Sequence, residues 1–171
     1  NRAISIKPDY AEAYCHMGVV LNDQGKLEDA IEAYKNATNY KPAYVEAWTN
    51  GAEALEKWNR LDQLEDWLIQ AFKSFKVIPS DIVYLQSKLL WRNKEFQKAF
   101  DLILTINDEA ITEVRKPDYL NLKAKCCESL KKYSMAFEYF SKMNSVTKNS
   151  ANFPIHQSDI FLKNIRNQLA L

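Results

Sequence analysis

The chain has 171 residues, a formal net charge of +1 and a hydrophobic content of 47%, which is ordinary for a soluble globular protein. Nucleic-acid-binding proteins usually carry a large excess of positive charge, which this chain lacks. No apolar run is long enough to span a membrane. Three cysteines, two of them adjacent, indicate a reduced, cytoplasmic protein.

Residues 1–7 resemble the end of a helix whose beginning is missing. Ala3 lies five residues before Pro8, just as Ala37 lies five residues before Pro42. We therefore expect the chain to begin inside a repeat and to be a fragment of a longer array. The apolar side of this segment would have no partner helix within the chain, so end-to-end self-association is a further hypothesis.

Residues 8–42 form the unit that the rest of the chain repeats. The motifs IKPDYAEAY and YKPAYVEAW surround two prolines that lie 34 residues apart, and a fixed period of this size is typical of stacked helical repeats. We expect two antiparallel helices joined by a turn at residues 22–25, with close contact at Gly18 and Ala30. The residues at helical spacing are Tyr14, Met17, Gly18 and Leu21 in the first helix and Leu27, Ala30, Ile31, Tyr34 and Ala37 in the second.

This arrangement closely resembles the tetratricopeptide repeat (TPR) family. That family has a 34-residue unit with an aromatic, a Leu-Gly pair, a Tyr, an Ala, an aromatic, an Ala and a Pro in fixed order. Met replaces Leu and Leu replaces Tyr in the present chain. The resemblance implies helix pairs that stack with their first helices along a concave groove. The matching positions are Tyr14, Met17-Gly18, Leu21, Ala30, Tyr34, Ala37 and Pro42.

The second repeat, residues 42–76, is bulkier than the first. Trp48 fills the first aromatic position, and Leu64 replaces the small alanine of the second helix. We expect Gly51 and Ala52 to make room opposite Leu64, because a larger side chain needs a smaller partner in a close-packed contact.

Two further repeats follow the same pattern. The third begins near Pro79 and has Ser87 at the close-contact position. A linker at residues 107–116 separates it from the fourth, which opens at Pro117, a favourable first residue for a helix. The register of the fourth repeat is anchored on Ala136.

Residues 148–171 combine a polar spacer with a last amphipathic helix, for which Ser158 is a suitable N-cap. We expect this helix to cover the open end of the array. The stretch from KAKCCESLKKY to FLKNIRNQL also resembles the end of the TPR arm in bacterial TPR–sulfotransferase fusion proteins. In those proteins a sulfotransferase domain follows, with a phosphate-cradling loop that contains an Arg-Ser-Gly-Thr-like run. No such run occurs in this chain, so the resemblance would place the catalytic domain beyond Leu171.

No residue set amounts to a catalytic, cofactor or metal site. Cys15 and His16 are adjacent, and adjacent residues on a helix point about 100° apart, so they do not face each other. The Cys126-Cys127 pair lacks the spacing of a zinc site. We expect Cys127 to be buried in the core and Cys126 to be partly exposed. Gly-Lys phosphate loops, HExxH and GxGxxG are absent from the sequence.

The register of the first helices predicts which side chains would line the groove that the TPR resemblance implies. The first two repeats contribute mostly acidic residues, and Tyr84 and Trp91 follow in the third, so we expect a basic-aromatic peptide ligand. Two alternatives stay open: the acids only keep the surface soluble, or the C-terminal helix or linker covers the two rings. TPR domains that clamp chaperone tails place a Lys and an Asn where this chain has Cys15 and Val19, so we reject that clamp. The predicted groove residues are Glu12, Cys15, Val19, Asn22, Glu46, Thr49, Glu53, Glu56, Tyr84, Lys88, Trp91, Asn121 and Lys125.

The sequence therefore predicts an all-α fold, an α–α solenoid of TPR type with an extra C-terminal helix. Residues 1–7 would end a truncated repeat, residues 8–147 would form about four helix pairs, and residues 148–171 would form the spacer and last helix. The predicted function is a non-catalytic cytoplasmic scaffold that binds a protein or peptide segment without a cofactor. The alternative is the substrate-positioning arm of a sulfotransferase.

Overall fold

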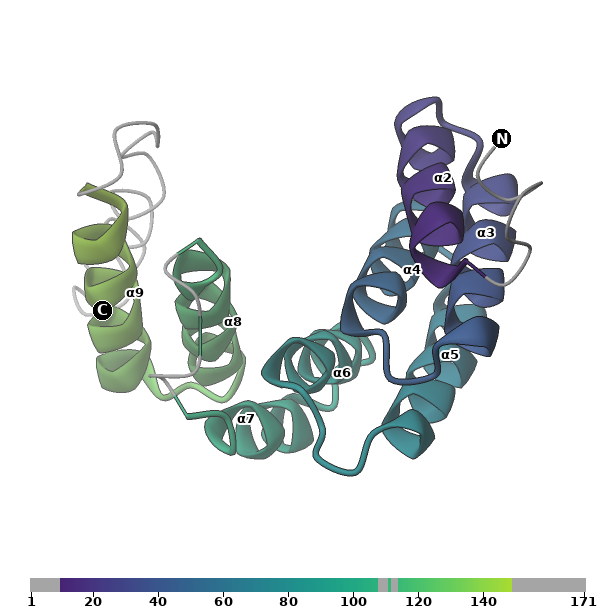
Figure 1. Cartoon of the computed structure of the whole chain (residues 1–171). Coiled ribbons are helices and arrows are strands. Elements are labelled where there is room, and N and C mark those ends of the chain that lie inside the picture. Colours follow the sequence, from purple (N-terminus) through teal and green to yellow (C-terminus); the bar gives the residue numbers. More distant parts are fainter. Residues whose placement is uncertain (1–9, 108–110, 112–113, 149–171) are drawn as a thin grey trace. The chain divides into compact units, whose positions relative to one another are not determined.

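The structure, a computed structural model, describes residues 10–107, 111 and 114–148 (Figure 1). Within these ranges the chain is all-α and contains no strand. The predicted ends, residues 1–7 and the helix after Ser158, lie outside the described residues. The helices are α2 (Ala11–Asp23), α3 (Leu27–Tyr40), α4 (Val45–Lys57), α5 (Leu61–Ser74), α6 (Ser80–Arg92), α7 (Phe96–Leu104), α8 (Lys116–Ser129) and α9 (Tyr133–Lys148).

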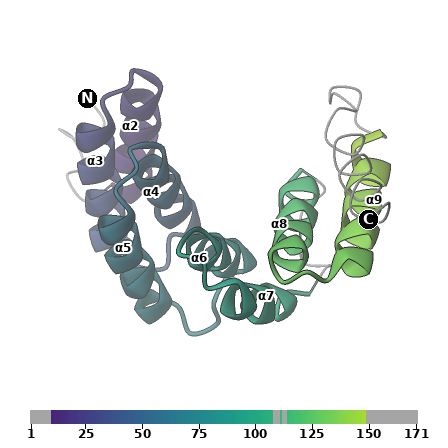
Figure 2. The same ribbon diagram turned by 180° about the vertical axis from the view of Figure 1, so that it is seen from behind.

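The chain divides into two compact units, which we call unit 1 (Asn1–Leu89) and unit 2 (Leu90–Leu171). In unit 1, α2 and α4 form one layer while α3 and α5 form the other (Figures 1 and 2). In unit 2, α8 packs against both α7 and α9. No helix in the described segments has the length and apolarity needed to cross a membrane.

Each helix pair is joined by the same tight turn, which contains one residue in the left-handed region. Gly25, Asn59, Lys94 and Lys131 occupy this position with φ of 76°, 58°, 64° and 59°. The following N–H bonds back to a carbonyl five residues earlier, as from Lys26 to Leu21 at 2.9 Å. This bond satisfies a carbonyl at the helix end. The turn of the first repeat is shorter than predicted, because α2 continues to Asp23.

The predicted close contact in the first repeat is confirmed. Ala30 is fully buried, and a Cβ atom added to Gly18 would lie 2.5 Å from Cε1 of Tyr34. Real Cβ atoms do not approach a ring carbon this closely, so only glycine fits beside the Tyr34 ring.

In the second repeat, the close contact at Gly51 is made by Trp67 and not by Leu64, which was predicted. A Cβ atom on Gly51 would lie 2.7 Å from Cε2 of Trp67, so the space at Gly51 is occupied by Trp67 rather than by Leu64. The indole nitrogen of Trp67 donates to the backbone carbonyl of Trp48 at 2.9 Å. The two indole rings meet edge to face with centroids 4.8 Å apart, which is a favourable aromatic geometry.

Unit 2 has its own core. The Tyr119 hydroxyl donates to the carbonyl of Ile103 at 2.7 Å, which ties α8 to α7, and Ala136 of α9 is fully buried as its register predicts. Cys126 and Cys127 are both fully buried. The predicted partial exposure of Cys126 is wrong, because α8 packs against a helix on each of two sides and buries both cysteines.

Candidate functional site

The predicted groove residues of the first two repeats lie along one stripe of α2 and one stripe of α4, a surface that we call the α2–α4 face. Two hydrogen bonds connect the helices. Asn50 donates to the sulfur of Cys15 at 3.9 Å, and Lys57 donates to the carbonyl of Asn22 at 3.4 Å. The exposed members are Glu46 and Glu53, and the half-buried ones are Glu12, Val19, Asn22 and Glu56.

Two predicted members are not on this surface. Cys15 is fully buried, and Thr49 is only 5% exposed. The Thr49 hydroxyl donates to the carbonyl of Glu46 in its own helix at 3.0 Å. Burial raises the pKa of the Cys15 thiol, more strongly than its hydrogen bond from Tyr44 lowers it. These side chains therefore support the packing of α2 against α4 instead of facing a ligand.

The α2–α4 face is less acidic than predicted. Lys41 follows α3, and its Nζ lies 2.7 Å from Oε1 of Glu12. Lys88 of α6 makes a pair of the same length with Glu56. Solvent-accessible pairs of this kind contribute only about 0–1 kcal/mol to stability, but they neutralise the half-buried carboxylates Glu12 and Glu56. Glu46 and Glu53 are the exposed carboxylates of the face, and Glu46 accepts a hydrogen bond from the Tyr44 hydroxyl at 3.2 Å.

Asn22, near the end of α2, gives the face a polar atom of a different kind. Its side-chain oxygen is buried and accepts no hydrogen bond from the described residues. A buried acceptor without a donor is unfavourable by about 1–3 kcal/mol, so a movement of the Asn22 side chain that brought this oxygen to a ligand donor would be favourable.

The predicted residues of unit 2 form a separate cluster. The Trp91 indole donates to the Ser129 hydroxyl at 3.3 Å, and Nζ of Lys125 lies 5.5 Å from the centre of the Trp91 ring. The side-chain oxygen of Asn121 is buried and lacks a donor among the described residues. Residues of α8 thus cover part of the Trp91 ring, which is half-buried. Tyr84 belongs to unit 1, where it packs against the hydrophobic core.

The groups able to do covalent or metal chemistry are dispersed. His16 is exposed on α2, and burial raises the pKa of Cys126 to about 12, so this thiol is protonated and unreactive at neutral pH. Among the described residues no group of three His, Cys, Asp or Glu side chains could hold a metal ion.

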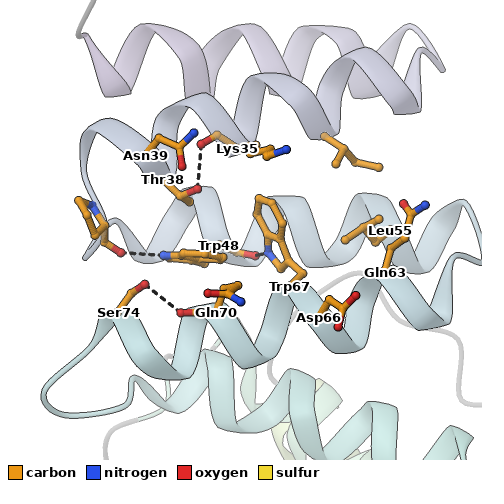
Figure 3. Close-up of a pocket in the computed structure, with 12 residues that line it drawn as sticks. Lys35, Thr38, Asn39, Trp48, Leu55, Gln63, Asp66, Trp67, Gln70 and Ser74 are labelled. Atoms are coloured by element: carbon orange, nitrogen blue, oxygen red, sulfur yellow. Dashed lines mark hydrogen bonds between the residues drawn. The ribbon is translucent and has the colours of Figure 1, made fainter.

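A groove that the sequence analysis did not predict lies on the α3–α5 side of unit 1. It has a volume of about 590 Å³ and is bounded by α3 and α5, with residues of α4 between them (Figure 3). Trp48, Leu55 and Trp67 contribute its apolar floor. We call it the tryptophan groove. Gly51 was the one sequence feature that could have indicated this groove. Glycine in a helix interior is unfavourable by about 1 kcal/mol, so its presence suggests that a side chain of another helix packs closely against it.

Comparisons with known proteins agree with this architecture. Residues 20–59 match a family model described as TPR repeat. The crystal structure of YrrB, described as a TPR protein with an unusual peptide-binding site, has 14% identity and a TM-score of 0.67, and the match covers 97% of this chain and 83% of YrrB. The pilF protein of Pseudomonas aeruginosa has 18% identity and a TM-score of 0.71, over 93% of this chain and 70% of pilF.

A crystal structure of MamA has 18% identity and a TM-score of 0.66, over 89% of this chain and 86% of MamA. A search of curated proteins gave no significant match. Identities this low establish a shared fold only. The match over residues 20–59 adds the repeat signature itself, and the helix pairs share one turn geometry. Residues 20–59 therefore carry a TPR repeat, and the chain has the fold of TPR proteins.

Proposed function

We propose that this chain is a non-catalytic scaffold that binds a protein or peptide segment on its α2–α4 face. The observation that carries the proposal is the surface itself. Two exposed carboxylates, Glu46 and Glu53, and the undonated side-chain oxygen of Asn22 lie on stripes of neighbouring helices. YrrB, which has the same fold, is described as having a peptide-binding site.

The chemistry of this face favours a segment that carries Lys or Arg. A positive side chain would pair with Glu46 or Glu53, and a backbone or side-chain N–H would satisfy Asn22. Because the carboxylates are exposed, we expect their contribution to be modest in energy, to accelerate association, and to weaken as salt is added. An aromatic anchor in the ligand would add apolar contact at Val19, which is half-buried beside Asn22.

A titration with the labelled peptide acetyl-Gly-Lys-Phe-Arg-Gly-amide tests the proposal, with an acidic peptide of the same length as a comparison. We expect the basic peptide to bind better and to bind more weakly at raised salt. The double variant Glu46→Lys/Glu53→Lys should reduce its affinity by about tenfold, since each exposed charge pair contributes roughly 0.2–1 kcal/mol and reversal adds repulsion.

The matched control is Glu32→Lys, a charge reversal at an exposed position of α3. It changes the net charge in the same direction but lies on the other layer, so binding should change little. Glu32→Lys changes the net charge by half as much as the double variant, so a loss of binding free energy in the control about half that of the double variant would mean that net charge alone drives binding. Preference for the acidic peptide would refute the proposal.

The alternative role as a substrate-positioning arm of a sulfotransferase stays a prediction, as does the cytoplasmic location. None of the described residues bears on either, and the α2–α4 face would serve a polypeptide acceptor equally well.

A further inference from the structure

The walls of the tryptophan groove come from α3 and α5, which the proposed α2–α4 site uses only for support, and its floor includes Trp48 and Leu55 of α4. Its floor is apolar although it contains two indole rings. Trp67 donates its N–H to the carbonyl of Trp48 at 2.9 Å, and Trp48 donates its own to the carbonyl of Pro42 at 2.7 Å. With both donors used inside the protein, the rings present only carbon to the groove (Figure 3).

The walls carry polar side chains that pair with no other side chain in the described ranges. Lys35 lies on the α3 wall and Asp66 on the α5 wall, so a positive and a negative charge border the same groove (Figure 3). In the described part of the chain neither makes an ion pair. Three carboxamides complete the rim, and their side chains likewise make no hydrogen bond to a described residue. They are Asn39, Gln63 and Gln70.

A short peptide has groups that can interact with the carboxamides, the indole floor and both charges of this groove. A carboxamide has both donors and an acceptor, so it can pair with the N–H and C=O groups of an extended backbone. The indole floor can take one apolar side chain. Lys35 and Asp66 can pair with an acidic and a basic residue on either side of it. The volume of about 590 Å³ lies within the roughly 300–1,000 Å³ that is usual for ligand sites.

We propose that the tryptophan groove is a second docking site, which takes an extended peptide segment with one apolar side chain between an acidic and a basic residue. The acidic residue lies toward Lys35 and the basic residue toward Asp66. The site is independent of the α2–α4 face, so either can fail without the other.

The indole N–H signals of the four tryptophans provide a direct NMR readout, with acetyl-Gly-Glu-Leu-Lys-Gly-amide as the probe. We expect the signals of Trp48 and Trp67 to shift on titration while those of Trp58 and Trp91 do not. The peptide with Ser in place of Leu should bind at least about fivefold more weakly, because it lacks the apolar side chain.

The charges are tested by Lys35→Glu, which makes both walls acidic. This variant should bind the Glu-Leu-Lys peptide about two- to fivefold more weakly and should bind a Lys-Leu-Lys peptide more tightly than the unmodified protein does, again with shifts at Trp48 and Trp67. Lys26→Glu, at an exposed position outside the groove, is the matched control and should leave both affinities unchanged. The double variant Glu46→Lys/Glu53→Lys should leave the Glu-Leu-Lys affinity unchanged as well.

Two results would overturn the proposal. One is the absence of shifts at Trp48 and Trp67 with millimolar peptide. The other is a shift of these signals with protein concentration in the absence of peptide, which would make a second copy of the chain the occupant. An affinity for the two peptides that does not respond to Lys35→Glu would remove the assigned charge recognition.

Discussion

Replacing Gly51 by alanine should destabilise unit 1, although alanine is the better helix former. The added Cβ would meet the indole of Trp67, 2.7 Å from Cε2, and the indole is held in place by its hydrogen bond to the Trp48 carbonyl. Overpacking of this kind is unfavourable by about 1–3 kcal/mol, and loss of the hydrogen bond adds about 1 kcal/mol. Alanine offsets about 1 kcal/mol through helix propensity, which leaves a net loss of roughly 1–3 kcal/mol.

Urea denaturation followed by far-UV circular dichroism measures this loss. Trp67→Phe removes the ring atoms that clash, so Gly51→Ala should be less destabilising in that background, by at least about 0.5 kcal/mol in a double-mutant cycle. If Gly51→Ala leaves the protein equally stable or makes it more stable, the indole has room to move, and the account of the groove floor is wrong.

Three further changes follow from the same structure. Gly18→Leu should lower the melting temperature by several degrees, because even a Cβ atom would lie 2.5 Å from the Tyr34 ring and overpacking is unfavourable by about 1–3 kcal/mol; an unchanged melting curve would contradict the register. Trp48→Ala should lower the free energy of unfolding by about 3–5 kcal/mol, since its ring is 6% exposed in the core; urea titration measures this, and a loss below about 1 kcal/mol would show that the ring is not a core element. Burial raises the pKa of Cys126 from 9.0 to about 12, so the folded state holds this proton more tightly than the unfolded state. The resulting stabilisation is complete below pH 9 and is lost as the pH rises toward 12. Urea titrations across this range should show that the free energy of unfolding falls with pH, and that it falls less steeply in Cys126→Ala. An equally steep fall in the variant would show that Cys126 is not the group responsible.

The sequence predicted the helix pairs because their period and small contacts are local patterns. Gly25 marked the first turn, since glycine adopts positive φ without strain. Lys94 and Lys131 have the same conformation, but lysine has no preference for it. At these positions the stacked helices impose the turn, so the turn could be predicted only from the pairing of the helices.

The candidate site was predicted less completely, for two physical reasons. A helical register gives the direction of a side chain but not the distance to the next helix, so it could not distinguish the buried Cys15 and Thr49 from the exposed Glu46. It also considers only the first helices. Lys41 follows α3 and pairs with Glu12 across the fold, so the charge of the face depends on a residue that the register does not include.

The tryptophan groove could not be predicted from either repeat alone. Its walls come from the second helices of two successive repeats, and its floor depends on Trp67 occupying the space at Gly51. Sequence shows each of these residues, but only the stacking of α3 and α5 on α4 brings them to one place (Figure 3).

The most direct test of the proposed function is an NMR map of where the peptide acetyl-Gly-Lys-Phe-Arg-Gly-amide binds in the intact chain. The proposal predicts shifts of backbone amides along α2 and α4, together with the side-chain amide of Asn22, while signals of α3 and α5 stay in place. Shifts confined to α3 and α5, or no shift at millimolar peptide, would contradict the assignment of the α2–α4 face as the binding surface.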